Sequence, residues 1–214
     1  MFLATVESLA DDEMTAPSLC EGWTRADVIA HVSSNGRALV KLIDWATSGE
    51  ERPLYASRDA RSQEIAALAA LPRQELVGDL RESAQNFAEQ AQRLGGELAA
   101  AEVQLNGKAL PATSIVALRI AEVVVHHHDL GSAWTIEEAD PDSLLNNALE
   151  AVVRSLRAKG SPGMTLVTEE RDECVIGDGG LRVVSDREGL LQWLARGDAE
   201  HIDVDGPVPV PPSW

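Results

Sequence analysis

Residues 24–46 read TRADVIAHVSSNGRALVKLIDWA, and this stretch carries the clearest helical pattern of the sequence. Thr24 and Asp27 form a start signal similar to a capping box, with Asp in place of the usual Glu or Gln. Apolar side chains then recur at helical spacing in one stripe, which consists of Val28, Val32, Leu39 and Leu42. The pattern predicts a helix from Thr24 to about Ala46, since breakers follow at Thr47, Ser48, Gly49 and Pro53.

Helical periodicity continues on both sides of this stretch. Pro72 separates the segments at 58–71 and 73–94, and glycines follow the segments at 73–94 and 111–130. The further segments expected to be helical are residues 1–11, 58–71, 73–94 and 111–130. Together with residues 24–46, the segments at 1–11, 73–94 and 111–130 predict a bundle of four main helices. The shorter segment at 58–71 lies in the long connection between the second and the third of them.

The pattern changes after Pro141. One more helix is predicted over residues 143–158 and a last one over residues 187–196. Asp178-Gly179 is a hairpin turn signal, and the prolines of the tail at 207–214 cannot continue a strand ladder. The expected strands are MTLVTEE at 164–170, ECVIGD at 173–178, LRVVS at 181–185 and IDVDG at 202–206. The predicted fold class is α+β, with a helix bundle over residues 1–140 and a small α+β domain over residues 141–214.

Charge and composition narrow the class of protein. The chain has 214 residues with 35 Asp and Glu against 18 Lys and Arg, so its formal charge is −17. An excess of negative charge disfavours binding to phosphate backbones and to anionic membrane surfaces. We therefore expect no nucleic-acid or membrane partner. The acidic N-terminus does not resemble a signal peptide, and two cysteines suit a reducing compartment, so the expected location is the cytoplasm. The oligomeric state stays open, and a monomer is compatible with the sequence.

Three ionisable side chains lie on faces that are otherwise apolar. Glu122 and His126 are four residues apart, so their side chains neighbour each other on one helix. His31 shares the apolar stripe of the helix at 24–46. Burying such groups without a partner costs several kcal/mol or more of folding free energy. They must therefore pair with each other or bind a ligand or ion. The spacing leaves two alternatives about equal: a zinc site with three protein ligands and an open position, or a buried His–Glu hydrogen-bond network.

Two motifs carry a resemblance to a known family, LCEGWTRADVIAHVSSNGRAL at 19–39 and LRIAEVVVHHHDLG at 118–131. With them the chain resembles the mycothiol-dependent maleylpyruvate isomerases, a branch of the DinB-like metalloenzymes, over essentially its whole length. The resemblance implies a DinB-like four-helix bundle that holds a divalent metal, usually zinc, on His31, Glu122 and His126. This chain starts close to the first motif, so its first bundle helix is expected to be shorter than usual in the family.

The resemblance also implies a reaction and a thiol cofactor. In this family the metal binds the sulfur of mycothiol, and a metal-bound thiol is deprotonated near neutral pH. The thiolate adds to the cis double bond of maleylpyruvate, and its expulsion after rotation leaves fumarylpyruvate, a step of gentisate-type aromatic degradation. Because no protein side chain need become covalent, Cys20 and Cys174 are expected to be small core residues. Two other functions stay open: a mycothiol S-transferase acting on another electrophile, and a non-catalytic metal-binding helix bundle.

Two arginines are candidates for binding the dicarboxylate substrate, because the planar guanidinium fits a carboxylate. Arg119 lies one helical turn before Glu122. Arg196 ends the last predicted helix and matches an arginine-glycine step of the family, where it can face the metal. A solvated arginine at a helix end is the alternative interpretation of Arg196.

Asn35 and Arg61 are the candidates for binding mycothiol. Asn35 matches an asparagine of the family, and it either binds the ligand or orients His31. Arg61 lies in the SRDAR segment at 57–61 and is a candidate for the sugar or inositol part of the thiol.

The residues that follow His126 are expected to have other roles. His127 and His128 point away around the helix and cannot share its metal, so we expect them to be solvated or packed against the second domain. Asp129 is expected to support the second ring nitrogen of His126 or to cap the helix.

Overall fold

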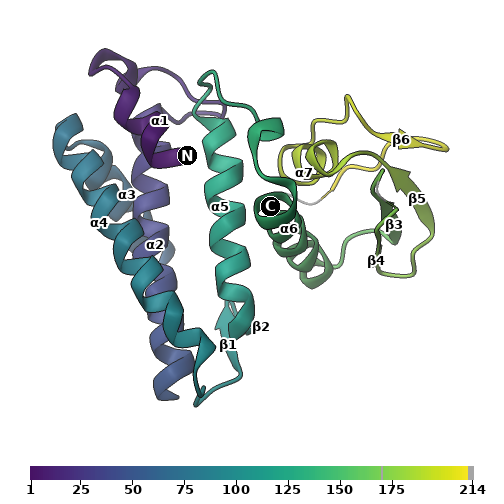
Figure 1. Cartoon of the computed structure of the whole chain (residues 1–214), viewed down its shortest axis with the longest axis horizontal. Coiled ribbons are helices and arrows are strands. Elements are labelled where there is room, and N and C mark those ends of the chain that lie inside the picture. The colour runs from purple at the N-terminus through teal and green to yellow at the C-terminus, as the bar shows by residue number, and fades with distance from the viewer. Residues whose placement is uncertain (170, 212–214) are drawn as a thin grey trace. The chain divides into compact units, whose positions relative to one another are not determined.

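The computed structural model describes residues 1–169 and 171–211. The chain divides into two compact units, Met1–Trp134 and Thr135–Trp214, and each is described by itself here. Figure 1 gives the element labels of both units. The division falls between Trp134 and Thr135, whereas the sequence pattern changes after Pro141.

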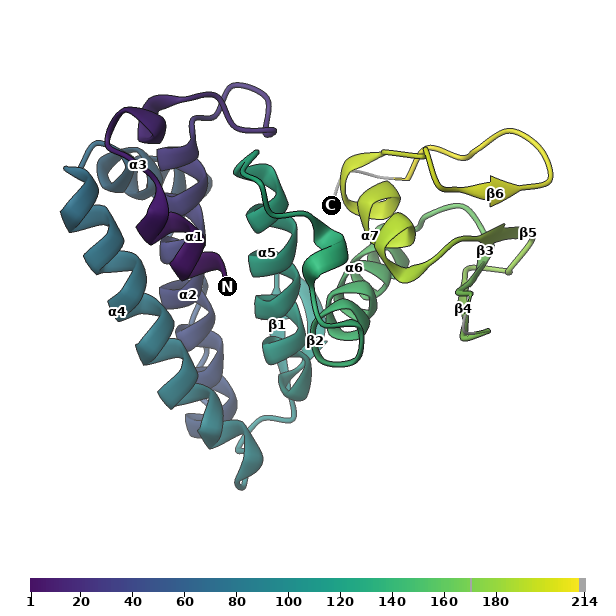
Figure 2. The same ribbon diagram turned by 45° about the horizontal axis from the view of Figure 1, so that its top comes forward.

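The first unit is a helix bundle. The helix α2 packs against α3, α4 and α5, and the short α1 packs against α4 and α5. Figures 1 and 2 show α2 running between α4 and α5. The helices are α1 (Phe2–Ser8), α2 (Arg25–Ser48), α3 (Arg58–Ala69), α4 (Arg73–Ala91) and α5 (Ile115–Asp129). The α+β class with an N-terminal helical part is confirmed.

The ends of α2 follow from its local sequence. Thr24 Oγ1 accepts a hydrogen bond from the Asp27 backbone N–H at 3.2 Å, and the Thr24 N–H donates to Asp27 Oδ2 at 2.9 Å. Asp27 therefore completes the capping box in place of a longer acid. At the other end Gly49 has a φ of 78°, the left-handed conformation that closes a helix.

The first helix is shorter than the predicted segment at 1–11. It ends at Ser8, and Leu9 is already extended with a ψ of 139°. The Ala10 N–H donates to Glu13 Oε2 at 2.8 Å, and a short 3-10 turn follows over Asp12–Thr15. The acidic side chain competes with the helical backbone for this donor, which explains the early end.

A β-hairpin between α4 and α5 was missed by the sequence analysis. Strand β1 (Glu102–Leu105) pairs antiparallel with β2 (Lys108–Pro111). Asn106 and Gly107 join the strands with φ angles of 52° and 76°, as a two-residue turn with both central residues left-handed requires. The Asn-Gly dipeptide was the available signal. Because β2 occupies residues up to Pro111, α5 begins only at Ile115.

A polar layer lies between two apolar clusters of the bundle. One cluster contains Val28, Ile29 and Leu76, and the other contains Leu39 and Ile115. Along α2, the residues between these clusters include four buried polar side chains, those of His31, Ser33, Ser34 and Asn35. Burial of so many polar groups costs free energy unless each is paired, so this layer is where a site is expected.

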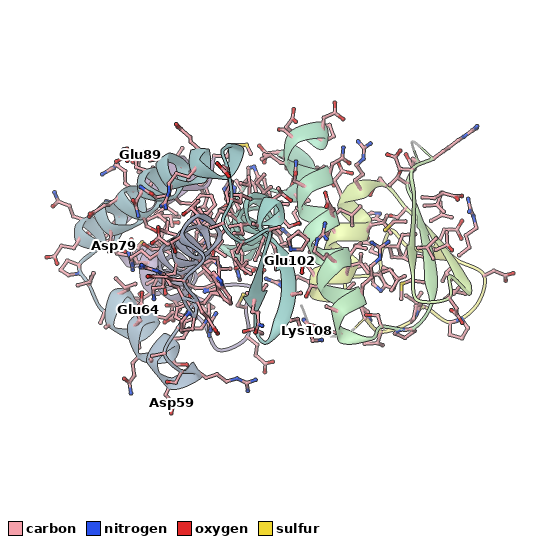
Figure 3. The ribbon with its side chains drawn as sticks, turned by 90° about the horizontal axis from the view of Figure 1, so that it is seen from below. Asp59, Glu64, Asp79, Glu89, Glu102 and Lys108 are labelled. Carbon is pink, nitrogen blue, oxygen red and sulfur yellow. The ribbon has the colours of Figure 1, made fainter. Side chains whose placement is uncertain are left out.

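Ion pairs on the outside tie α2 to its neighbours. The Arg37 guanidinium lies 2.9 Å from Asp79 Oδ2 on α4 and 3.5 Å from Glu64 Oε1 on α3. Both acidic side chains are labelled in Figure 3. These groups are partly exposed, so each pair contributes little more than about 1 kcal/mol.

The second unit combines two helices with a small sheet. Its helices α6 and α7 pack against each other, and Trp193 of α7 is fully buried. The strands lie in the order β4-β3-β5-β6. The elements are α6 (Asn146–Lys159), β3 (Met164–Val167), β4 (Glu173–Ile176), β5 (Leu181–Val184), α7 (Arg187–Arg196) and β6 (Asp203–Val204).

The prediction of a hairpin at Asp178-Gly179 is wrong. Strands β4 and β5 are not neighbours, because β3 lies between them, antiparallel to β4 and parallel to β5. Thr165 Oγ1 on β3 donates to the Gly179 carbonyl at 2.9 Å and so holds this turn against β3. A turn dipeptide predicts a change of direction but not which strands pair. The last residue of the expected strand at 164–170 and residues 212–214 of the tail lie outside the described residues.

Candidate metal centre

His31, Glu122 and His126 meet inside the first unit. His31 projects from α2, and Glu122 and His126 project from successive turns of α5. Nε2 of His31 lies 3.0 Å from Glu122 Oε2, and Nε2 of His126 lies 3.5 Å from the same oxygen. One ligand atom from each residue lies within 4.8 Å of the other two. The structure thus brings together the three residues that the sequence analysis names as metal ligands.

This donor set fits a divalent cation. Two imidazoles and a carboxylate converge from two helices, and the side chain of Glu122 is only 17% exposed. Three protein ligands of this kind are the pattern of catalytic zinc sites, which keep a further position for water or substrate. Helix bundles commonly build metal sites in this way, from facing helices.

Asp129 lies behind His126. Its Oδ2 atom is 2.7 Å from Nδ1 of His126, and the carboxylate is fully buried. A carboxylate on the second nitrogen of a metal-binding histidine orients the ring and raises its basicity. This contact agrees with the support expected from Asp129. Cys20 is a further neighbour, since Cys20, His126 and Asp129 offer atoms within 4.8 Å of one another.

The protonation states of the three candidate ligands differ in the metal-free chain. Burial lowers the pKa of His126, but the contacts with Asp129, Cys20 and Glu122 outweigh it and raise that pKa to about 10. Burial raises the pKa of Glu122, but hydrogen bonds with His126 and His31 outweigh it and hold that pKa well below its usual value. Burial lowers the pKa of His31 against its hydrogen bond with Glu122. Near neutral pH the set is a cationic His126, an anionic Glu122 and a neutral His31.

Arg61 determines which nitrogen of His31 carries the proton. Nη2 of Arg61 lies 3.1 Å from Nδ1 of His31, and a guanidinium can only donate. Nδ1 therefore accepts, and the neutral ring donates from Nε2 to Glu122. A cation on Nε2 requires the proton to be on Nδ1 instead. The contact with Arg61 is thus specific to the metal-free ring.

Asn35 and Arg119, two further candidates, contact each other. Nη1 of Arg119 donates to Asn35 Oδ1 at 2.8 Å and to the Val32 carbonyl at 2.7 Å. The guanidinium also lies 5.8 Å from the centre of the Phe87 ring. Burial lowers the pKa of Arg119 to about 10, so it stays cationic at neutral pH. The structure places both residues in the polar layer, and their contact with substrate or thiol stays a prediction.

The family model of the mycothiol maleylpyruvate isomerase N-terminal domain matches residues 1–131. The chain belongs to this family. Two solved structures are similar to this chain along its whole length. The first is the crystal structure of a mycothiol-dependent maleylpyruvate isomerase, with a TM-score of 0.81 and 28% sequence identity over 100% of this chain and 91% of that chain. The second is a histidine-to-alanine mutant of a mycothiol-dependent maleylpyruvate isomerase, with a TM-score of 0.80 and the same identity and coverage.

These matches confirm the resemblance that the two motifs indicated, and they support an isomerase. A search among curated proteins finds no match. Within the described residues, no helix has the length and apolar character needed to cross a membrane.

Arg196, the remaining candidate, belongs to the second unit of this family member. It lies at the end of α7, where Gly197 closes the helix with a φ of 78°. Its Nη1 donates to the Ala195 carbonyl at 2.8 Å. A contact between Arg196 and the substrate stays a prediction.

His127 corrects one expectation. Its ring is stacked on Trp134 at 3.8 Å between ring centres and meets the edge of Phe2 at 5.5 Å. Nε2 lies 2.7 Å from Thr5 Oγ1. His127 is therefore buried within the first unit, where it contacts α1 through Phe2 and Thr5 and stacks on Trp134.

The sequence analysis missed three neighbours of the centre. Trp23 meets the edge of the His31 ring at 5.6 Å, and Cys20 precedes it in the same motif. Tyr55 lies with its hydroxyl 3.3 Å from Ser34 Oγ and with its ring under Arg61 at 5.9 Å. Cys20 and Trp23 lie in the same sequence motif as His31, and this position could have indicated that they are near the centre. Tyr55 lies in an irregular connection, where no periodicity predicts the direction of a side chain.

Proposed function

We propose that this chain is a mycothiol-dependent maleylpyruvate isomerase that converts maleylpyruvate to fumarylpyruvate. The observation that carries the proposal is the convergence of His31, Glu122 and His126 in a member of this family. Solved isomerases described as mycothiol-dependent share the fold at 28% identity. We place the reaction in the cytoplasm, as a step of gentisate-type aromatic degradation.

His31, Glu122 and His126 would hold a divalent cation, and zinc suits a set of imidazoles with a carboxylate. Bound zinc supplies the positive charge that keeps a thiol deprotonated near neutral pH, and mycothiol supplies the sulfur nucleophile. Asp129 holds the His126 ring from behind, so that Nε2 faces Glu122. His31, His126 and Asp129 are buried, and burial in a medium of lower dielectric constant strengthens the charge interactions among these groups.

The substrate carries two carboxylates, and a chain with a formal charge of −17 must place cations beside them. Arg119 is a fixed positive charge in the polar layer, held by Asn35 and the Val32 carbonyl. Arg196 is the second arginine that we propose for a substrate carboxylate. Preoriented guanidinium groups favour a planar dicarboxylate, because each can bind two oxygens at once.

An isomerisation leaves the atoms of the substrate unchanged. The protein has to bind the cis isomer, present the thiol to the double bond and release the trans isomer. No acyl or glycosyl group passes to a side chain, so the mechanism needs no serine or cysteine nucleophile from the protein. The cysteines Cys20 and Cys174 are free thiols that this mechanism does not use for covalent chemistry.

The direct test follows fumarylpyruvate formation from maleylpyruvate by zinc-loaded protein, with and without mycothiol. We expect turnover only with mycothiol, and its loss in His31→Ala. His201→Ala is the matched control, because His201 is an exposed histidine of the second unit. Equal turnover without the thiol, or full activity of His31→Ala, would contradict the proposal. If zinc is bound but maleylpyruvate is not isomerised, the proposal is wrong and transfer of the thiol to another electrophile takes its place.

A further inference from the structure

Tyr55 is the single tyrosine of the chain, and it lies in the connection between α2 and α3. Its hydroxyl is 3.3 Å from Oγ of Ser34, a fully buried side chain of α2. Ser34 follows His31 by three residues, so the two side chains are neighbours on one face of the helix. The phenol therefore reaches from a connection into the polar layer, about one helical turn from a candidate metal ligand.

Two cations hold Tyr55 in this place. Nζ of Lys41 donates to the Leu54 carbonyl at 2.8 Å and lies 5.9 Å from the centre of the Tyr55 ring. The guanidinium of Arg61 lies 5.9 Å from the same centre. Cations at this distance attract an aromatic ring, so α2 and α3 both hold a side chain that belongs to neither helix. The direction of the phenol is thereby fixed before a ligand binds.

The hydroxyl of Tyr55 is a neutral donor that is only weakly engaged. Burial raises the pKa of Tyr55 above its ordinary value of 10.0 and outweighs the opposite effects of Ser34 and Arg61, so the phenol is protonated near neutral pH. Its distance to Ser34 Oγ exceeds the usual separation of about 2.7–2.8 Å for two hydrogen-bonded hydroxyls. In the described part of the chain, Ser34 is the one hydrogen-bond partner of this hydroxyl. A ligand oxygen can therefore accept the O–H in place of a weak contact.

The phenol is also within reach of a small ligand. Tyr55 lines a cleft of about 300 Å³ in the first unit, at the lower end of the range for small-molecule sites. Charged groups of two helices act on the phenol, since Arg61 and Glu64 of α3 and Glu122 of α5 influence its pKa. The phenol in turn influences the pKa of Arg119, a proposed binding group for a substrate carboxylate. Tyr55 is therefore close both to a candidate metal ligand and to a candidate substrate arginine.

The proposed reaction places negative charge on one further oxygen of the substrate. While sulfur is bonded to the double-bond carbon remote from the ketone, the electron pair of the double bond lies on the ketone oxygen as an enolate. After rotation the pair returns to carbon and the carbon–sulfur bond breaks, so no proton has to be gained or lost. Arg119 and Arg196 are proposed for the two carboxylates, which leaves the ketone oxygen in need of a donor. A neutral donor aimed at an oxygen that gains charge only during the reaction lowers the barrier without tightening substrate binding.

From these observations we infer that Tyr55 is a catalytic residue whose hydroxyl donates a hydrogen bond to the ketone oxygen of the substrate while that oxygen carries the enolate charge. The inference rests on the proposed function, since it takes maleylpyruvate as the substrate. Ser34 holds the hydroxyl in the free protein and releases it to the substrate. The phenol keeps its proton throughout, so its effect depends on the O–H and not on the ring.

Tyr55→Phe tests this role, because it removes the O–H and keeps the ring. We expect kcat of the zinc-loaded protein with mycothiol to fall about 100-fold or more, while KM for maleylpyruvate changes by no more than about threefold. The control Ser62→Ala removes an exposed hydroxyl from α3 and should keep the wild-type kcat. An unchanged kcat in Tyr55→Phe, or a rise in KM that accounts for the whole loss, would overturn the inference.

The single tyrosine also allows a spectroscopic test of contact. Incorporation of 3-fluorotyrosine in place of tyrosine gives one fluorine NMR signal, which belongs to residue 55. We expect this signal to shift when the zinc-loaded protein with mycothiol is brought to equilibrium with saturating fumarylpyruvate, which carries the same ketone. A signal that stays in place would show that the phenol does not touch the bound substrate and would overturn the inference.

A last readout separates this inference from the proposed function. In cobalt-substituted protein, mycothiol reports on the metal centre through a sulfur-to-cobalt absorption band, which we expect to be equal in the wild type and in Tyr55→Phe. A band lost in Tyr55→Phe would show that Tyr55 supports the metal centre and would overturn its role as a donor to the substrate. A wild type that does not isomerise maleylpyruvate would overturn the proposed function together with this inference. A wild type that isomerises it as fast as Tyr55→Phe does would overturn this inference alone.

Discussion

At the scale of the single residue, the contact at the second ring nitrogen of each candidate histidine ligand affects how well the candidate centre can bind a cation. Asp129 contacts Nδ1 of His126 at 2.7 Å, and Arg61 contacts Nδ1 of His31 at 3.1 Å. The carboxylate favours a proton on its nitrogen, whereas the guanidinium excludes one. The first contact therefore supports a cation on Nε2, and the second opposes it.

Asp129→Asn should weaken zinc binding by about 10- to 100-fold, because the neutral amide no longer raises the basicity of His126. Competition with a chromophoric chelator at neutral pH measures the Kd. Asp59→Asn is the control, since Asp59 is an exposed acid of α3. The prediction fails if Asp129→Asn binds zinc as tightly as the wild type does.

Arg61→Gln should have the opposite effect and tighten zinc binding in the absence of thiol by about fivefold, which corresponds to a net hydrogen bond of about 1 kcal/mol. The amide oxygen can accept from Nδ1–H, so nothing has to be displaced when the cation binds. Arg58→Gln, one turn earlier on α3, is the control. Weaker zinc binding by Arg61→Gln than by Arg58→Gln would show that the Arg61 contact does not oppose the metal.

At the scale of the element, buried polar groups fix how the helices of the first unit pack. His127 joins α5 to α1 through Thr5 and Phe2. Gly36 allows α2 to approach α4 and α5, since a Cβ there would lie 2.5 Å from Ser83 Oγ and 3.2 Å from Arg119 Nη2. Both positions therefore lend themselves to tests of stability.

The first test concerns how the free energy of unfolding falls in acid because His127 is buried. Burial lowers the pKa of His127 to about 4, below its ordinary value of 6.5. As the pH falls below 6.5 the unfolded chain takes up this proton first, so the folded state loses stability until about pH 4. The loss between pH 7 and pH 4 is about 3 kcal/mol. Urea unfolding should show that the stability of His127→Phe falls by about 3 kcal/mol less than that of the wild type between pH 7 and pH 4.

His127→Phe should also lose about 1 kcal/mol at every pH, because the hydrogen bond with Thr5 is gone. His201→Phe should keep the full acid dependence, since His201 is exposed. An equal loss between pH 7 and pH 4 in the wild type and in His127→Phe would contradict the burial of a neutral His127.

The second test compares two helix glycines. Gly36→Ala should lower the free energy of unfolding, because the new methyl group displaces Ser83 from its 2.6 Å hydrogen bond with the Ser33 carbonyl. Gly78→Ala on α4 meets nothing within 4 Å and should raise it by about 1 kcal/mol through helix propensity. Chemical denaturation of the two variants measures the contrast. The packing argument is wrong if both substitutions change stability in the same direction.

At the scale of the whole molecule, periodicity predicted elements better than it predicted their partners. The helices at 24–46 and 58–71 appear close to their expected bounds, because a stripe of apolar side chains reports directly on a helix face. The order β4-β3-β5-β6 could not be predicted, since the choice of strand partners depends on contacts distant in the sequence. The hairpin at 102–111 carried its Asn-Gly signal within a stretch too short for a periodic pattern.

The candidate site was predictable to a similar extent. His31, Glu122 and His126 stood out because ionisable groups interrupt apolar faces at helical spacing, and the family resemblance then favoured a metal over a hydrogen-bond network. That Arg61 would contact His31, and that Arg119 would contact Asn35, depended on how α2 packs against α3 and α5. Tyr55 and the cleft beside it lie on connections, whose side-chain directions no local pattern predicts.

The most direct measurement of the central claim is the rate of mycothiol-dependent isomerisation of maleylpyruvate as zinc is returned to metal-stripped protein. The account predicts no turnover without zinc, a linear rise as zinc is added and a sharp break at one zinc per chain, set by His31, Glu122 and His126. A stripped protein that isomerises at the full rate, or a break that persists in Glu122→Gln with full activity, would contradict it.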